Sequence, residues 1–462
     1  MTSTRILSLT TLLLSLVLTG CAKHQLYRDD LALCQAPEPE QACPNNALQK
    51  VSAQGHDSPA YLLGFVEFDD QGQLFSRPQL MAVTDQLNTL AANDDLLMVV
   101  FVHGWKHSAA PGDENIRSLR KTLRRLDQLE RHLAGLDGRK PRQVVGVYLG
   151  WRGGSVDMPL LKELTFWERK STAHKVGQGA VTEVLNRLEL IRNTRNHVAA
   201  DEPDRAETRL VVVGHSFGGA VVYSSLSQIL MNRFVETRGP QGLVSDVIGF
   251  GDLVVLINPA FEAARFTPLS DMANARRSYF KSQLPVMVIL TSEADKATKY
   301  AFPVGRGFST LFETHRKTER PNPVTGEAVT LDQQAANMTA VGHYAPYRTH
   351  TLKAVSQSPA LDAVQAMSIQ AALQRFRVVS EGWENDRPGG SIVFGGMQLQ
   401  RSDDSVSKNP YLVVQVDREL IHNHNDIDDP RILAFIRQLI LLSSQHSDPA
   451  ARLQQRALLP AE

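Results

Sequence analysis

The residues best suited to chemistry fall in three stretches that lie far apart in the chain. The first is the pentapeptide Gly-His-Ser-Phe-Gly at 214–218, with Ser216 at its centre. A serine hydroxyl is a weak nucleophile until a nearby histidine takes its proton and an acid orients that histidine. The stretch 291–295 supplies carboxylates and the stretch 421–427 supplies histidines. A nucleophile, an acid and a base in this chain order predict acyl transfer through a serine.

The surroundings of Ser216 favour a nucleophile elbow over a chance occurrence of the pentapeptide. An apolar run ends at Gly214, and helix-compatible sequence begins after Ser216. A Gly-x-Ser-x-Gly string between a strand and a helix is typical of a strained turn that exposes the serine hydroxyl. Gly214 and Gly218 are expected because a Cβ there would collide with the turn and with the following helix.

The acid should follow a strand that comes after the elbow. Asp295 lies a few residues beyond the apolar run 286–290 and is the preferred candidate. Glu293 is a close rival, and Glu262, which follows the run 253–257, is a more distant one.

The base should come from the loop behind the last strand, expected at 411–416. His424 is the preferred base and His422 is the alternative. His343 and His350 lie between the acid and the base, and we expect them to be structural or pocket residues.

An acyl-transfer site also needs preorganised donors for the developing oxyanion. One should be the N–H of Phe217, directly after the nucleophile. The other should come from the loop that follows the strand 96–102, where the sequence is His103-Gly104-Trp105. Trp105 N–H is the preferred donor, since Gly104 allows the backbone to turn inward.

The elements that must position these residues alternate between strands and helices. Apolar runs predict strands at 61–68, 96–102, 143–149, 210–213, 253–257, 286–290 and 411–416. Helical spacing of apolar residues predicts helices at 114–134, about 170–195, 217–233, 359–376 and 431–442. This alternation predicts an α/β fold with a mostly parallel sheet and helices on both faces. In such sheets the chemistry lies at the carboxyl ends of the strands.

Composition limits the classes of function. The 462 residues hold 49 basic and 49 acidic side chains, so nothing favours a nucleic-acid partner. A hydrophobic share of 42% is enough for a sizeable core. The pair His422 and His424 lacks a third ligand at metal-binding spacing, and no metal or organic cofactor is implied.

Residues 1–20 predict an export signal. Arg5 is followed by an apolar stretch at 6–18, which is too short to span a bilayer. The ending Leu-Thr-Gly-Cys at 18–21 resembles the lipobox of bacterial lipoproteins. That resemblance implies a lipid on Cys21 as the mature N-terminus and, with Ala22 next, an outer-membrane location facing the periplasm. The alternative is an ordinary secretory signal with an incidental cysteine.

The other two cysteines, Cys34 and Cys43, can form a disulfide in an oxidising periplasm or remain free thiols. They lie in a proline-containing segment, 21–57, that predicts a tether between the anchor and the globular part.

The chain resembles the α/β-hydrolase superfamily, in particular bacterial esterase- and lipase-like members. The resemblance rests on His-Gly at 103–104 and on Gly-His-Ser-Phe-Gly-Gly at 214–219, and it covers about 60–300 and 405–445. It implies a hydrolase core at 58–300 that is completed by 406–446, with a tail at 447–462. The intervening segment, 301–405, is an insertion that predicts either a lid over the site or a surface elaboration.

A second wall of the site is expected in the connection after Leu149. It is rich in large apolar residues, which either line an acyl pocket or pack beneath the next helix. They are Trp151, Met158, Leu160, Leu161, Leu164, Phe166 and Trp167.

These features predict a serine hydrolase of carboxylic esters at the cell envelope, with a small-molecule or lipid ester as substrate and the membrane as partner of the anchor. The alternatives are an amidase or phospholipase, or a non-catalytic lipoprotein that uses the hydrolase fold as a binding scaffold.

Overall fold

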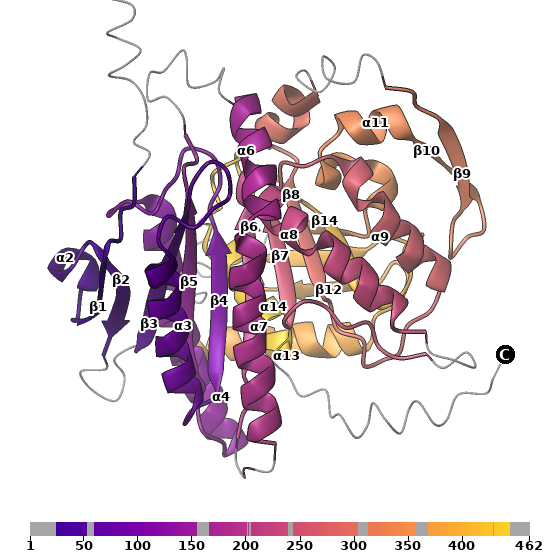
Figure 1. Cartoon of the computed structure of the whole chain (residues 1–462). Coiled ribbons are helices and arrows are strands. Elements are labelled where there is room, and N and C mark those ends of the chain that lie inside the picture. The colour runs from indigo at the N-terminus through magenta and orange to yellow at the C-terminus, as the bar shows by residue number, and fades with distance from the viewer. Residues whose placement is uncertain are drawn as a thin grey trace, which may run out of the picture.

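The computed structural model describes residues 25–52, 60–154, 166–200, 202, 205–238, 244–303, 313–355, 368–427 and 429–443. The predicted signal peptide, Cys21 and the tail at 447–462 lie outside these residues. The main sheet has twelve strands within the described part, in the order β1-β2-β3-β5-β4-β6-β7-β8-β14-β11-β13-β12 (Figure 1). None of the helices in these ranges has the length and apolar character needed to cross a membrane.

The centre of the sheet is parallel, as the sequence predicts. Adjacent strands run in one direction from β3 to β14. Their bounds are Tyr61–Phe68 (β3), Gln143–Trp151 (β5), Leu96–Val102 (β4), Arg209–His215 (β6), Leu253–Ile257 (β7), Met287–Ser292 (β8) and Tyr411–Val416 (β14). Nearly every residue of these strands is buried, because helices cover both faces of the sheet. Their carboxyl ends therefore meet along one edge.

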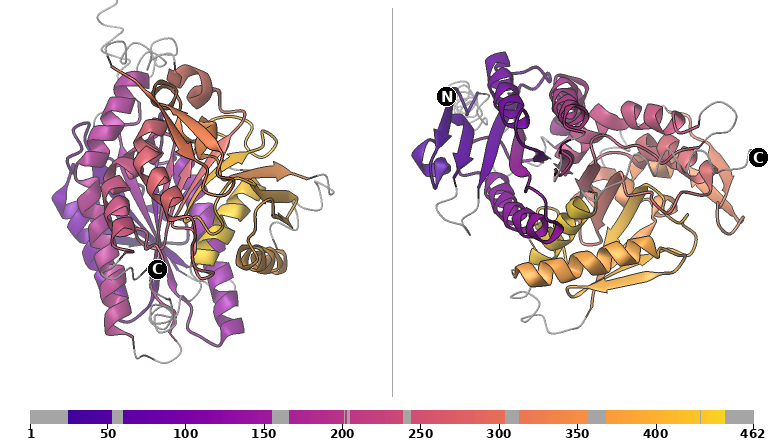
Figure 2. Two further views of the ribbon diagram at one scale, coloured as in Figure 1. Left: turned by 90° about the vertical axis from the view of Figure 1, so that its right-hand side faces the viewer. Right: turned by 90° about the horizontal axis from the view of Figure 1, so that it is seen from below.

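Helices form a layer on each face (Figure 2). One layer packs its apolar side chains into the core on the first face: α3 (Arg77–Ala91), α6 (Phe166–Gln178), α7 (Val181–Val198), α8 (Phe217–Val235) and α9 (Ala263–Arg276). The other consists of α4 (Glu114–Asp137), α13 (Ile369–Glu384) and α14 (Pro430–Ser443). The single helix expected at 170–195 is two helices, α6 and α7. The break lies at Ala180, whose N–H donates to Gly72 O at 2.8 Å.

The prediction that 21–57 is a tether is wrong for residues 30–51. They form β1 (Asp30–Gln35), α2 (Pro39–Ala42) and β2 (Asn46–Val51), and β2 pairs antiparallel with β3. Cys34 and Cys43 form a disulfide in this segment, with their Cα atoms 6.3 Å apart. Without this segment the fully buried strand β3 would present an open edge, which proteins cover or pair.

A buried cluster of polar groups fastens the start of this segment to the rest of the fold. The side chain of Arg28 is fully buried and its Nε donates to Ala109 O at 2.8 Å. The same guanidinium pairs with Glu40 at 3.1 Å. The Glu67 carboxylate accepts the N–H of Arg28 at 2.8 Å. Burial lowers the pKa of Arg28 and Glu40 opposes this shift, so the pair holds its charges inside the fold.

The insertion at 301–405 is largely built into the sheet. Beyond β14, the sheet continues through β11 (His350–Ala354), β13 (Met397–Arg401) and β12 (Ser391–Phe394). A separate hairpin, β9 (Lys317–Pro321) with β10 (Ala328–Asp332), is followed by α11 (Gln333–Met338) and lies beside α9 (Figure 1). The helix expected at 359–376 is α13 where it is described, and 356–367 lie outside the described residues. That the insertion acts as a lid stays a prediction.

We expect Arg28→Ala to lower the free energy of unfolding by about 3 kcal/mol, because it leaves half-buried Glu40 without one cation and the buried Ala109 O without its donor. Urea unfolding followed by circular dichroism measures this change. The matched control is Arg117→Ala, whose exposed side chain pairs with exposed Glu114. If both variants unfold like the wild type, the N-terminal segment does not contribute to the core.

Candidate active site

The backbone at Ser216 is strained in the manner that the elbow requires. Ser216 lies between β6 and α8 with φ 56° and ψ −120°. A non-glycine residue with positive φ costs on the order of 1–3 kcal/mol and persists only where its surroundings enforce it. Here Ser216 N–H donates to Ile257 O at 2.9 Å, and Gly219 N–H donates to Ser216 O at 3.0 Å.

Two glycines create the space around this turn. A Cβ on Gly104 would lie 2.7 Å from the Cβ of Ser216, and a Cβ on Gly214 would lie 2.7 Å from Gly218 O. Both distances are shorter than real Cβ contacts. The loop that carries Gly104 therefore lies directly against the serine.

Ser216, His424 and Asp295 form a continuous chain of hydrogen bonds. Ser216 Oγ donates to His424 Nε2 at 2.5 Å, and His424 Nδ1 donates to Asp295 Oδ2 at 2.9 Å. Asp295 is fully buried, while Ser216 and His424 are 1% and 9% exposed. Burial alone would raise the pKa of Asp295, but the electrostatic interaction and hydrogen bond with His424 and the donors of Thr298 hold that pKa below its usual value. The carboxylate is thus ionised and able to fix the tautomer of His424.

Two hydrogen bonds to the backbone carbonyl of His424 hold the loop that carries this residue. His424 O accepts hydrogen bonds from His215 Nε2 and from Asn258 Nδ2, both at 3.0 Å. Asn258 follows β7 at φ 45°, and its Oδ1 accepts the N–H of Ser292 at 2.9 Å. Burial lowers the pKa of His215 to about 3, so it stays neutral with its proton on Nε2. These contacts join the ends of β6, β7 and β8 to the histidine loop.

The alternative acids and bases lie elsewhere. The Glu262 carboxylate pairs with buried Lys170 and with Arg265, and it lies 3.9 Å from His174 rather than beside His424. His422 is exposed and contacts Asp426 at 3.0 Å. His350 is buried in β11, with Nδ1 2.9 Å from Thr349 Oγ1. Asp295, and not Glu293, is the carboxylate that contacts His424.

The loop expected to supply an oxyanion donor is rigidly packed. His103 stacks on Trp151 with ring centres 5.6 Å apart. His103 Nε2 accepts the N–H of Trp151 at 3.0 Å, and His103 O accepts Trp151 Nε1–H at 2.9 Å. The indole of Trp105 is buried, with Lys106 Nζ 4.0 Å above its ring. Trp151 thus supports this loop. The other apolar residues expected to line a pocket lie outside the described residues at 155–165, or have side chains that are not described (Phe166 and Trp167).

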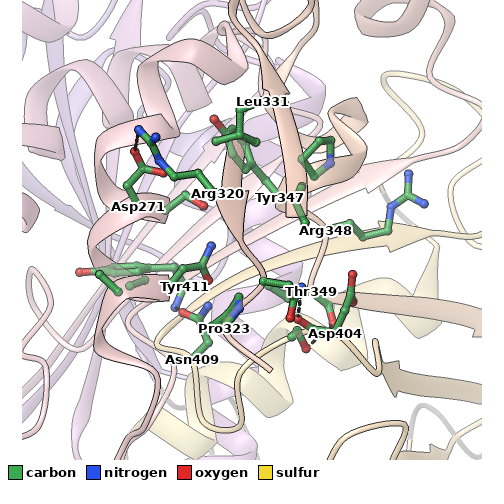
Figure 3. Close-up of a pocket in the computed structure, with 18 of the residues that line it drawn as sticks. Asp271, Arg320, Pro323, Leu331, Tyr347, Arg348, Thr349, Asp404, Asn409 and Tyr411 are labelled. Carbon is green, nitrogen blue, oxygen red and sulfur yellow. Dashed lines mark hydrogen bonds and ion pairs between the residues drawn. The ribbon is translucent and has the colours of Figure 1, made fainter. Parts of the chain in front are cut away.

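A cavity of about 430 Å³ lies away from this site, between α9, the β9–β10 hairpin and the segments 346–349 and 404–411 (Figure 3). None of the three hydrogen-bonded site residues lines it. Its walls mix apolar groups such as Tyr347 with the ion pair of Arg320 and Asp271, which are 3.4 Å apart.

Sequence reasoning missed Asn258 and Thr298. Thr298 is three residues after Asp295, and its N–H donates to Asp295 Oδ1 at 3.1 Å. An Asp whose side chain accepts the N–H three residues later is the usual helix N-cap, so the spacing Asp-x-x-Thr carried a recognisable signal. Asn258 carried none, because its partners come from distant parts of the chain.

No protein-family model matches the chain, and neither does any curated protein. Among solved structures, it is similar to a cutinase of Trichoderma reesei bound to a C11Y4 phosphonate inhibitor, with 13% identity over 39% of this chain and 66% of that chain and a TM-score of 0.15. It is also similar to phospholipase PlaB of Legionella pneumophila in complex with thio-NAD, with 12% identity over 78% of this chain and 61% of that chain and a TM-score of 0.23. A second structure, of PlaB alone, is similar to this chain with 12% identity over 78% of this chain and 62% of that chain, and with a TM-score of 0.24. Each match spans less than two thirds of the other protein, and likeness of this size carries no information on substrate.

The strand order, the elbow after β6, the carboxylate after β8 and the histidine after β14 define the class of this protein. It has an α/β-hydrolase-like fold with twelve strands in the described part of its sheet.

We expect Gly104→Ala to lower the free energy of unfolding by about 2 kcal/mol, because the new methyl group would force Ser216 or the loop to move. The matched control is Gly135→Ala in α4, where a Cβ would meet open space. There the better helix propensity of alanine should raise stability by about 0.5–1 kcal/mol. Chemical denaturation compares the two variants. Equal stability of Gly104→Ala and wild type would contradict the close approach.

The buried histidines predict a loss of stability in acid. Burial lowers the pKa of His350 to about 3, so the unfolded chain binds a proton below about pH 6.5 that the folded chain refuses. Stability conferred by the neutral form is therefore complete at pH 8 and lost as pH falls from about 6.5 toward 3. We expect His350→Gln to reduce the loss between pH 8 and pH 5 by about 2 kcal/mol.

Unfolding free energies measured across this pH range test the prediction, with His197→Gln, an exposed histidine on α7, as the control. Parallel pH curves for wild type and His350→Gln would show that His350 has no part in the acid sensitivity.

Proposed function

We propose that this protein is a serine hydrolase that cleaves carboxylic esters through an acyl-enzyme. The observation that carries the proposal is the hydrogen-bonded chain from Ser216 Oγ through His424 to Asp295, built on the ends of three strands. His424 takes the proton of Ser216 as the oxygen attacks the ester carbonyl, and then gives it to the leaving alcohol. Water activated by His424 releases the acid in a second round.

The donors proposed for the oxyanion are the N–H groups of Phe217 and Trp105. Phe217 is the first residue of α8, directly after the nucleophile. Trp105 follows Gly104, whose Cα faces Ser216 closely enough that a Cβ would clash. A tetrahedral intermediate on Ser216 would thus form between these two backbone segments, where fixed donors are most effective.

A non-catalytic scaffold is the weaker alternative. It has no need for a strained Ser216, for the close approach of Gly104 or for a buried, ionised Asp295, each of which costs stability. Amide and phospholipid substrates remain alternatives within the same mechanism, because the described residues fix the reacting groups and not the acyl chain. We further propose that Cys21 carries the lipid that holds the enzyme at the outer membrane, facing the periplasm.

Labelling with a fluorophosphonate probe tests the activated serine. The chain from Ala22 onward should be labelled at a single serine, and Ser216→Ala should abolish labelling, because this probe reacts only with serines that have an assembled base. The matched control is Ser225→Ala, a buried serine on the same helix that donates to Gly177 O at 2.7 Å. It should lose some stability and keep its labelling.

Hydrolysis of p-nitrophenyl esters of increasing chain length then ranks substrates. A folded wild-type protein that takes up no probe and hydrolyses none of these esters would contradict the proposed function and favour the scaffold.

A further inference from the structure

The Asp295 carboxylate has a second attachment besides His424. Thr298 contacts both of its oxygens: the backbone N–H donates to Oδ1 at 3.1 Å, and the hydroxyl donates to Oδ2. Thr298 is 1% exposed, so both of these hydrogen bonds to Asp295 are shielded from water. Oδ2 thus receives two donors, Thr298 Oγ1–H and His424 Nδ1–H.

A third residue, His343, contacts the hydroxyl of Thr298. His343 Nε2 lies 2.9 Å from Thr298 Oγ1. The hydroxyl proton already points at the ionised carboxylate, so the hydroxyl oxygen can only accept from the imidazole. His343 must therefore carry its proton on Nε2. Burial lowers the pKa of His343 to about 4, although Asp295 opposes the shift, so the ring is neutral near pH 7.

His343 reaches this place because the insertion packs against the core. It ends the short turn η4 (Val341–His343). Val341 N–H donates to Phe261 O at 3.0 Å, and Ala340 forms an isolated β-bridge with Glu262. The turn is thereby fixed to the segment that follows β7. The insertion thus delivers a side chain to the acid of the site from a position 45 residues away from Thr298 in sequence.

We propose that His343 is a positioning residue that orients the Asp295 carboxylate through the hydroxyl of Thr298. The proposal rests on the proposed function and deepens it. All hydrogen bonds in the array point toward the carboxylate: His343 donates to Thr298 and Thr298 to Asp295 from one side, while Ser216 donates to His424 and His424 to Asp295 from the other.

The chemistry explains why a neutral donor is needed at 343. As long as an N–H occupies the lone pair of the hydroxyl oxygen, the hydroxyl proton is directed to Asp295. An acceptor at 343 would compete with Asp295 for that proton, and an apolar side chain would leave the hydroxyl free to rotate. In either case Asp295 holds His424 less firmly, while the binding of substrate is unaffected.

The test uses variants of the full mature chain. His343→Gln keeps an N–H donor close to the position of Nε2. The side chain of His343→Asn is too short for its amide to reach Thr298, and His343→Leu has no donor. Thr298→Val removes the hydroxyl with little change in shape. The active fraction of each variant is titrated with the fluorophosphonate, kcat and KM are measured with p-nitrophenyl butyrate, and thermal unfolding checks the fold. His197→Leu, an exposed site on α7, is the control.

We expect kcat per active site to fall about tenfold in His343→Leu and His343→Asn, with KM changed less than about twofold, and to recover in His343→Gln. In the Thr298→Val background, His343→Leu should cause no further loss, because its effect passes through the hydroxyl. If His343→Leu fails to fold, the kcat of His343→Asn tests the proposal in its place.

An unchanged kcat in both His343→Leu and His343→Asn would overturn the proposal. A kcat in the Thr298→Val/His343→Leu double variant that falls by the product of the two single losses would overturn it as well. A wild type that neither takes up probe nor turns over ester overturns the proposed function itself, which separates that failure from failure of this inference.

Discussion

The buried negative charge of Asp295 is the constraint on which the site depends. An isolated carboxylate inside a protein costs several kcal/mol unless donors and a counter-charge surround it. Here the donors come from Thr298 next along the chain and from His424 in a loop 129 residues away. The lowered pKa of Asp295 shows that these partners outweigh the penalty of burial. The hydrogen bond from His424 to this carboxylate therefore holds the His424 loop at the end of β8.

The sheet makes that contact geometrically possible. β14 pairs in parallel with β8, with Val416 beside Ser292, so the two chains leave the sheet at the same level. One strand further, Asn258 spans the gap by accepting from Ser292 and donating to His424 O. Because β6 ends beside β7, Ser216 meets the same group of loops. Parallel strands with their carboxyl ends together place Ser216, His424 and Asp295 within hydrogen-bond reach.

Additions at both ends of the sheet stabilise this arrangement. The N-terminal strands cover β3, and Arg28 ties them to Ala109, in the loop that also carries Gly104 and Trp105. At the other end, β11 pairs with β14, and the turn before it brings His343 to Thr298. Each addition protects a sheet edge and also contacts a segment of the site, which gives the extra chain length a structural reason.

The sequence alone determined the central strands, the elbow and the chain order of the three residues that form the hydrogen-bonded site, because these signals are local. Long apolar runs, glycines around Ser216 and helical periodicity are legible within a few residues. Only the tertiary structure shows that Asp295, and not Glu293, contacts His424, and that His424, and not His422, contacts Ser216. Two like residues close together in an irregular loop carry the same sequence signal, although their side chains point in different directions. Which of them makes the contact depends on which side chain faces a partner that is far away in sequence. The N-terminal strands and the contact of His343 were beyond local reasoning for the same reason: strand pairing and side-chain contacts across tens of residues are created by packing, which no short stretch of sequence encodes.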